Sequence, residues 1–468
     1  MEPALAPSLR VIGSRTSEND IRTITPVAQD VKKSDDEENT TTSPAAAGVT
    51  AITRGETLMP EAFPEGGLQA WLCVLGSFFL LLPSYGLMVS VGTLQDYWRE
   101  HQLKAYSIRD IGWIPSVYVY LGLGLGLWVG PLFDRYGPRV LTIVGSIIYI
   151  ITMFALAECK KYWHFMLCLG VVGGTSAALI TTAGLSAVSH WFDKRRGRAT
   201  GFAMIGNTIG GTFIPLILRA TFPRYGWAWA IRILALAMLA CLIIGNIFVK
   251  GRLTPGPPSA EENKRGVMSF HLFADARFTL FVLTVWGIEI VLFGSLGILP
   301  TYSSLQGYPS MTGFYVISIM NGVSCLGRIL PGFVSDYVGR FNMLLLMLFL
   351  TWIVMLVIWL PFGSNSLTAL YIFAALFGFG TGSWMALVPV CVGQLCRAEE
   401  FGRYFGTCYF IASLATLVCI PIGGELVETV GPQPMAGFFC AVLFLSLICF
   451  VLSRWACLGW KWKWNVKI

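Results

Sequence analysis

Two ionisable side chains, Glu289 and Arg328, interrupt long apolar stretches in the second half of the chain. Ionisable groups in such stretches are costly and are functional hypotheses by default. A guanidinium can hold a carboxylate through two parallel hydrogen bonds. A carboxyl group in apolar surroundings can take up a proton, because burial disfavours its charged form. Arg328 is therefore a candidate anion contact and Glu289 a candidate proton-coupling group.

Both residues also have structural interpretations. Arg328 could pair with Asp336 or with helix-end carbonyls, and Glu289 could form a hydrogen bond to a neighbouring helix. Other polar or aromatic side chains in apolar stretches are more often helix-packing or cavity-wall residues than specific ligands. Those retained as substrate-binding candidates are Tyr85, Asn207, Asn321, Ser324 and Trp384.

No metal site or cofactor is predicted. The 12 cysteines form no CxxC pair, and most lie in apolar blocks, where a thiol behaves as a small hydrophobe. The histidines His164, His190 and His271 are too scattered for a metal site. A membrane enzyme would need clustered His, Cys or carboxylates at membrane depth, so the chain is not predicted to be an enzyme.

The composition places these residues in a membrane. Hydrophobic residues make up 55% of the 468 positions and charged residues 13%, whereas soluble domains carry about 25% charge. A helix needs roughly 20 apolar residues to cross the hydrocarbon. Twelve blocks of suitable length are predicted at 69–92, 111–132, 139–157, 162–187, 199–218, 229–249, 277–299, 311–333, 341–360, 366–390, 404–424 and 436–455.

The remaining segments are polar. Residues 1–64 are rich in Ser, Thr and charge and are predicted to be a disordered tail. Residues 250–276 read as a linker between bundles at 65–249 and 277–455, and 456–468 as a C-terminal tail. Basic residues concentrate in alternate loops, while the intervening loops of the second half carry none. This asymmetry predicts that both termini are cytoplasmic, and we expect the plasma membrane.

The two halves repeat. Gly130-x-x-x-Asp134 follows the second block and Gly332-x-x-x-Asp336 follows the eighth, with the aspartates 202 residues apart. Gly197-Arg198-x-x-Gly201 and Gly402-Arg403-x-x-Gly406 open the fifth and eleventh blocks at an offset of 205. Such duplication is typical of a transporter whose site lies between two halves.

The repeated loops are predicted to form a gate. The two glycines should let a helix end approach its neighbour closely, and the two aspartates can pair with arginines or cap a helix. Pairs that break and reform suit a latch; a static salt bridge is the alternative. The predicted gating residues are Gly130, Asp134, Arg135, Gly137, Arg139, Arg198, Gly332, Asp336, Arg340 and Arg403.

The loop GxxxDRxGxR, read here from Gly130 to Arg139, resembles the signature loop of the major facilitator superfamily. Its second copy lacks the basic residue after Asp336, which is also typical of that family. The resemblance covers about 65–455. It implies an all-α membrane protein whose twelve transmembrane helices form two pseudo-symmetric six-helix bundles.

Two further motifs are similar to the monocarboxylate porter family, in its fungal-type branch. They are Glu65-Gly66-Gly67 with Ala70-Trp71, and the run from Trp191 to Ala203. The resemblance implies that Arg328 binds the substrate carboxylate. Animal members carry a carboxylate at the place of Ser324 and a lysine in the first span, which this chain lacks, so the ionic pair associated with proton coupling is incomplete.

These observations predict a secondary active transporter that moves a small organic solute, with a carboxylate or other organic anion favoured. Protons are a candidate coupling ion. The sequence leaves open efflux of a fungal secondary metabolite, and, from other classes, a channel or a non-transporting sensor. The predicted partners are the solute and the lipid bilayer, with no nucleic acid, and a monomer is expected.

Overall fold

The computed structural model describes residues 66–192, 196–252, 270–309, 311–396 and 401–461. The predicted tail at 1–64 lies outside these residues, as do the middle of the predicted linker and the end of the C-terminal tail. The described residues belong to one compact unit. Its described residues form helices and contain no strand.

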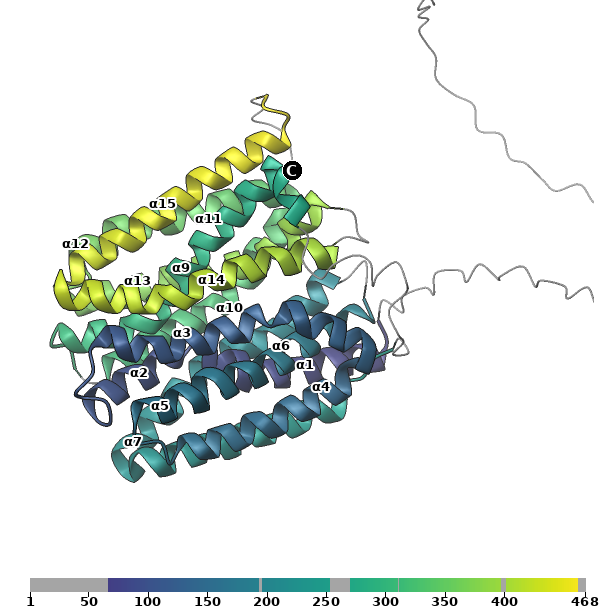
Figure 1. Ribbon diagram of the computed structural model, residues 1–468. Helices are drawn as coiled ribbons and strands as arrows, with labels where there is room; N and C mark the ends of the chain where they lie inside the picture. Colours follow the sequence, from purple (N-terminus) through teal and green to yellow (C-terminus); the bar gives the residue numbers. More distant parts are fainter. Residues whose placement is uncertain (1–65, 193–195, 253–269, 310, 397–400, 462–468) are drawn as a thin grey trace, which may run out of the picture. The chain divides into compact units, whose positions relative to one another are not determined.

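The helices before residue 252 make up the N-terminal half. They are α1 (Leu68–Met88), α2 (Val91–Glu100), α3 (Ile108–Gly124), α4 (Gly126–Leu156), α5 (Tyr162–Phe165), the π-helix η1 (Met166–Gly173), α6 (Gly174–Ser189) and α7 (Arg196–Phe248). Figure 1 shows them as one set of adjacent helices with roughly aligned axes.

The helices after residue 269 make up the C-terminal half. They are the 3₁₀-helix η2 (Phe270–Ala274), α9 (Ala276–Leu305), α10 (Thr312–Val338), α11 (Arg340–Val354), the π-helix η3 (Met355–Trp359), α12 (Leu360–Phe362), α13 (Leu367–Leu395), α14 (Phe401–Thr429) and α15 (Pro432–Cys457). In Figure 1 they form a second set beside the first.

Eleven continuous helical stretches in the described residues are long and apolar enough to cross a membrane. One of them, Arg198–Phe248, has 51 residues and would extend for about 75 Å, against a hydrocarbon core of about 30 Å. Its backbone leaves the helical region at Gly226, with φ 68° and ψ −176°. It therefore supplies two crossings, which gives the twelve predicted from the sequence.

Short polar caps begin several of the helices. The Ser107 side chain accepts a hydrogen bond from the Asp110 N–H, and the Ser366 side chain accepts one from the Ala369 N–H. Asp275 caps α9 by accepting from the Arg277 N–H, and the Arg277 guanidinium lowers the pKa of the Asp275 carboxyl. Such caps satisfy N–H groups that have no partner within the first helical turn.

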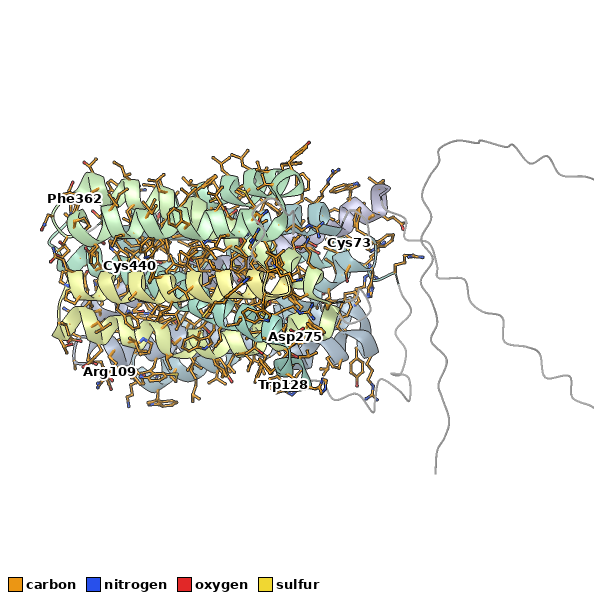
Figure 2. The ribbon with its side chains drawn as sticks, turned by 90° about the horizontal axis from the view of Figure 1, so that it is seen from above. Cys73, Arg109, Trp128, Asp275, Phe362 and Cys440 are labelled. Atoms are coloured by element: carbon orange, nitrogen blue, oxygen red, sulfur yellow. The ribbon has the colours of Figure 1, made fainter. Side chains whose placement is uncertain are left out.

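Successive spans alternate in direction, as short connections require. Figure 2 shows Arg109 and Phe362 at one end of the helices and Cys73, Asp275 and Trp128 toward the other. We call the first the Arg109 end and the second the Asp275 end. The sequence predicts that the Arg109 end is external.

Glycines set the closest helix contacts within each half. On α13, a Cβ at Gly378 or Gly382 would overlap with backbone carbonyls of α10, at Met320 and Ser324. In the other half, a Cβ at Gly174 would lie 2.8 Å from the Tyr118 carbonyl oxygen. The glycine-rich stretches of the fourth and tenth predicted blocks therefore serve equivalent packing in the two halves.

Candidate functional site

Three helix pairs form most of the boundary between the halves. They are α3 with α14, α7 with α10, and α2 with α9. The ionisable residues that the sequence singles out lie on two of these helices, Glu289 on α9 and Arg328 on α10. Both are buried, with 3% and 8% of their surface exposed.

Arg328 forms hydrogen bonds to the opposite half. Its Nη1 donates to the Met204 carbonyl oxygen at 2.6 Å and to Asn207 Oδ1 at 2.5 Å, both on α7. Its Nε has no hydrogen-bond partner among the residues that the structure describes, and the same holds for Asn207 Nδ2. The site therefore contains a buried guanidinium and two N–H donors, on Arg328 Nε and Asn207 Nδ2, that no described residue uses.

A narrow pocket lies beside Arg328, and in this conformation it has room for about one water molecule. Polar groups of α10 form one wall, where Arg328 lies with Asn321 and Ser324. The other lining residues are mainly apolar and come from the residue after α1 and from α9, α10 and α13: Val89, Leu292, Leu296, Met320, Thr381, Gly382 and Met385. A mostly apolar pocket with a few polar groups is the usual form of a small-molecule site.

The two polar neighbours of Arg328 on α10 differ in their bonds. Asn321 Nδ2 donates to the Ile317 carbonyl oxygen at 3.0 Å and to the Gly211 carbonyl oxygen of the other half at 3.4 Å. Ser324 Oγ donates to the Asn321 carbonyl oxygen within its own helix, at 2.8 Å. Asn321 thus adds a link between the halves, whereas Ser324 lines the pocket with a hydroxyl that is already bonded.

Glu289 lies on the same face of α9 as Leu292 and Leu296, at helical spacing. Its Oε2 has no hydrogen-bond partner within the described residues. Tyr85 of α1 and Tyr409 of α14 both lie within electrostatic reach of Glu289. The same two tyrosines lie within reach of Arg328, so the predicted residues Tyr85, Glu289 and Arg328 belong to one region.

Trp384 is apart from this group. It is fully buried on α13 and its ring meets that of Phe377 edge-on, with 6.0 Å between the ring centroids. Its neighbour Met385 lines the pocket. The structure therefore brings Trp384 next to the pocket wall rather than into the lining.

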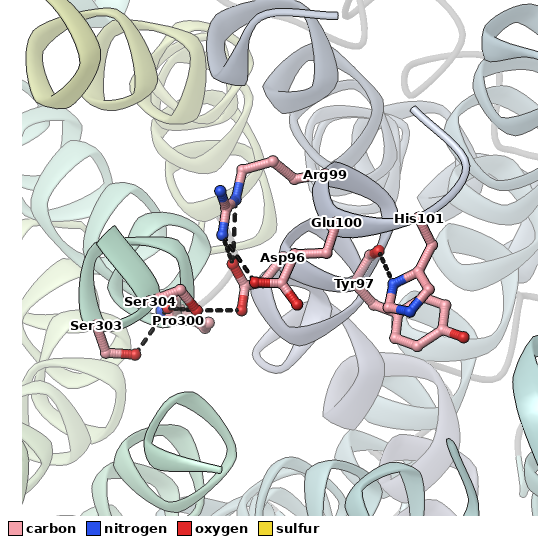
Figure 3. Close-up of polar contacts among 8 residues, drawn as sticks. All are labelled: Asp96, Tyr97, Arg99, Glu100, His101, Pro300, Ser303 and Ser304. Carbon is pink, nitrogen blue, oxygen red and sulfur yellow. Dashed lines mark hydrogen bonds and ion pairs between the residues drawn. The ribbon is translucent and has the colours of Figure 1, made fainter. Parts of the chain in front are cut away.

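Polar contacts join the halves at the Arg109 end. Figure 3 shows the Asp96 carboxylate of α2 accepting a hydrogen bond from Ser304 Oγ of α9, at 2.8 Å, while Arg99 Nη2 approaches its other oxygen at 3.3 Å. At the start of α3, the Ile108 N–H donates to Glu428 Oε2 at 3.1 Å and Arg109 pairs with Glu425 at 3.3 Å. These contacts therefore hold the two halves together at the Arg109 end.

The repeated loops adopt the same backbone turn. Gly137, inside the residues assigned to α4, has φ 74°, and Gly339, before α11, has φ 101°. Glycine favours this left-handed region because it lacks a Cβ. In the first copy, Arg139 Nε donates to the Val249 carbonyl oxygen at 3.4 Å, which ties the loop to the end of the sixth span.

One expectation about these loops is wrong in this conformation. A Cβ at Gly130 or Gly332 would meet no atom within 4 Å among the described residues. These glycines therefore allow no close helix approach here. Both lie toward the Asp275 end, away from the polar contacts that join the halves.

The remaining predicted gating residues lie near the same loops. Arg135 is exposed and stands over the Tyr136 ring, 5.4 Å from its centroid. Arg198 is exposed near the start of α7, and Arg340 begins α11. The side chains of Asp134, Asp336 and Arg403 lie outside those that the structure describes, so the predicted latch stays a prediction.

Sequence reasoning missed Tyr409. The repeat could have indicated this residue. Met204 and Tyr409 are 205 residues apart, and each lies three residues after the last glycine of the repeated Gly-Arg-x-x-Gly motif. It also missed Asp96, Glu425 and Glu428, because acidic residues near helix ends are common and only the fold shows what they contact.

Known protein families and proteins resemble this chain over most of its length. The family model of the Major Facilitator Superfamily matches residues 72–407 and 325–461. The chain is 35% identical to the riboflavin transporter of Saccharomyces cerevisiae over 426 residues, which cover 86% of this chain and 81% of the relative.

Efflux proteins are also similar. The fujikurins efflux protein of Gibberella fujikuroi is 31% identical over 84% of this chain and 83% of its own length. The aspyridones efflux protein of Emericella nidulans is 30% identical over 82% of this chain and 77% of its own length. Together with the two helical halves and the site between them, these matches show that the chain belongs to the major facilitator superfamily of membrane transporters.

Proposed function

We propose that the chain is a secondary active transporter of a small organic solute that bears a carboxylate or another anionic group. Arg328 carries this proposal. It is a buried cation on the pocket between the halves, and its Nε donor is left over in the described part of the chain. An anionic group entering the pocket would pair with the guanidinium through charge-assisted hydrogen bonds.

The mechanism is alternating access by rocking of the two halves about this site. In the predicted orientation, the Arg109 end, where polar contacts join the halves, faces outward. A solute that takes over hydrogen bonds from Met204 and Asn207 weakens a link between the halves. Its binding therefore changes the relative free energy of the two conformations, as transport requires. The repeated Gly-x-x-x-Asp loops are the proposed latch at the other end.

The finer class remains the fungal-type branch of the monocarboxylate porters. Ser324 stands where animal members have a carboxylate, which favours a larger or less acidic solute over lactate with a proton. The riboflavin transporter among the relatives is consistent with a solute larger than a monocarboxylate. Efflux of a secondary metabolite is the second candidate, because two similar proteins are named as efflux proteins.

Glu289 is the proposed proton-coupling group. Its neighbours Tyr85, Tyr409, Cys408 and Cys419 are the titratable groups within electrostatic reach. None of them is a base that would pair with the carboxylate. We also propose a monomer in the plasma membrane, with both termini in the cytoplasm.

An untargeted metabolite comparison tests the function. Cells that produce the wild-type chain, Arg328→Ala or no chain are compared for metabolites inside and outside. Arg328→Ala should match cells without the chain while its surface abundance stays normal. Arg232→Ala is the matched control, because Arg232 pairs with Glu158 within one half. Normal transport by Arg328→Ala would refute the assignment, and ohmic flux without counterflow would indicate a channel.

A further inference from the structure

Glu289 and Arg328 lie at the same depth on two helices that contact each other. Glu289 is 16 residues before the end of α9, and Arg328 is 16 residues after the start of α10. At about 1.5 Å per residue, each lies about 24 Å from the Arg109 end. Their interactions nevertheless do not include one another, and no ion pair joins them in the described ranges.

Two tyrosines connect these separated groups. Tyr85 and Tyr409 each lie within electrostatic reach of both Glu289 and Arg328, although the two charged residues do not reach each other. The tyrosines come from opposite halves, on α1 and α14. Tyr85 is buried and Tyr409 is half-buried. Each tyrosine is therefore near enough to both a carboxyl group and a guanidinium to interact with them.

The two sides of this region offer opposite hydrogen-bonding groups. Arg328 Nε and Asn207 Nδ2 are hydrogen-bond donors, and Glu289 Oε2 is a carboxyl oxygen that can accept. All three atoms are buried and have no hydrogen-bond partner among the described residues. Buried polar groups without partners are rare in folded proteins and need a reason. One molecule with an acceptor at one edge and a donor at the other would satisfy all of them.

We propose that Glu289, Tyr85 and Tyr409 form a second subsite, which receives an N–H or O–H donor of the same solute whose anionic or acceptor group binds Arg328. This inference rests on the proposed contact of Arg328 with the solute. The transported class is then an organic molecule with two polar edges, such as a hydroxy acid or a heterocycle with an N–H group. A carboxylate with a purely aliphatic body would offer Glu289 no hydrogen-bond donor.

The apolar residues of the pocket fit the middle of such a molecule. Leu292 and Leu296 continue the face of α9 that carries Glu289, and Met320 and Met385 face the same pocket from α10 and α13. Methionine side chains adapt to bodies of different shape. The polar edges would then set specificity, and the apolar body would contribute binding without strict selection.

Equilibrium binding to the purified full chain tests the inference without any ion gradient. The probes are two matched pairs, riboflavin with its N3-methyl derivative and lactate with 2-methoxypropionate. Within each pair, methylation removes the N–H or O–H group that could donate a hydrogen bond to Glu289. The wild type should prefer the donor-bearing member of at least one pair by about tenfold or more, the range of a hydrogen bond to a charged group.

The variants locate that preference. Glu289→Leu and Tyr409→Phe should bring the ratio within the pair close to one, while Glu289→Gln, which keeps an acceptor oxygen, should retain part of it. Tyr371→Phe, near the start of α13, is the control for loss of a tyrosine hydroxyl. Arg328→Ala should weaken both members of the pair equally.

The outcomes separate the two proposals. A ratio that Glu289→Leu and Tyr409→Phe leave unchanged overturns the second subsite, even if Arg328→Ala weakens binding. Binding that Arg328→Ala leaves unchanged overturns the proposed function instead. Absence of binding by all four probes also overturns the stated solute class, because the probes cover both a small acid and a large heterocycle.

Discussion

Arg328 Nη1 on α10 donates a hydrogen bond to Asn207 Oδ1 on α7, at 2.5 Å, across the boundary between the two halves. The bond joins a cation to a neutral amide, so the positive charge stays uncompensated. A carboxylate at position 207 would compensate it, which makes Asn207 the residue that keeps the cation available for a solute.

Asn207→Asp should therefore inhibit transport more than Asn207→Ala. The new carboxylate would pair with the guanidinium and compete with an anionic solute, at a cost of about 1.5–3 kcal/mol, or roughly ten- to hundredfold in apparent affinity. The concentration dependence of uptake measures this, normalised to surface-labelled protein. Equal activity of the aspartate variant and the wild type would show that no anion binds at Arg328.

Glu289→Gln should separate solute exchange from proton movement. The amide cannot ionise, so alkalinisation of the medium during uptake should disappear, while exchange of labelled for unlabelled solute continues. In reconstituted vesicles, a pH dye reports the proton movement and the labelled solute reports the exchange. Proton uptake that survives the substitution unchanged would remove Glu289 as the coupling group.

Opening of the Arg109 end should follow loss of its acidic contacts. The Arg109–Glu425 pair is exposed and contributes little, whereas the bond from the Ile108 N–H to the Glu428 carboxylate is charge-assisted. Together we assign them about 1–3 kcal/mol. Glu425→Gln with Glu428→Gln should raise the outward-open population about five- to hundredfold.

The rate at which an impermeant maleimide modifies a cysteine placed at Leu292, in a background without accessible native cysteines, reports that population. Glu158→Gln is the control, since Glu158 pairs with Arg232 inside the N-terminal half. A rate that rises equally in the control would mean general loosening rather than gate opening.

Gly378→Ala should destabilise the protein, because the added Cβ would overlap with the Met320 carbonyl. Overpacking of this kind typically costs about 1–3 kcal/mol. Thermal unfolding of the detergent-purified protein measures the effect. Gly332→Ala is a matched control, since a Cβ there meets no described atom within 4 Å; similar melting temperatures for both variants would contradict the packing interpretation.

The sequence predicts local features of this molecule well. Spans follow from apolar blocks, and the two turns at Gly137 and Gly339 follow from a repeated motif whose glycine recurs in both copies. Arg328 and Glu289 stand out because a charged group in an apolar membrane span is costly and usually has a function.

Features that depend on contacts between distant helices were harder to predict. The Glu428 carboxylate meets the start of α3, 320 residues earlier in the chain, and nothing in either segment indicates the other. Gly130 and Gly332 show the opposite error. A small residue permits close packing but does not cause it, and here a Cβ would meet no described atom within 4 Å.

The glycine contacts between α10 and α13 also restrict how these two helices can move relative to each other. At Gly378 and Gly382 the backbones of the two helices meet directly, so a slide of one helix along the other would bring these backbones into overlap. The two helices are therefore expected to move as one body where they meet when a solute displaces Arg328.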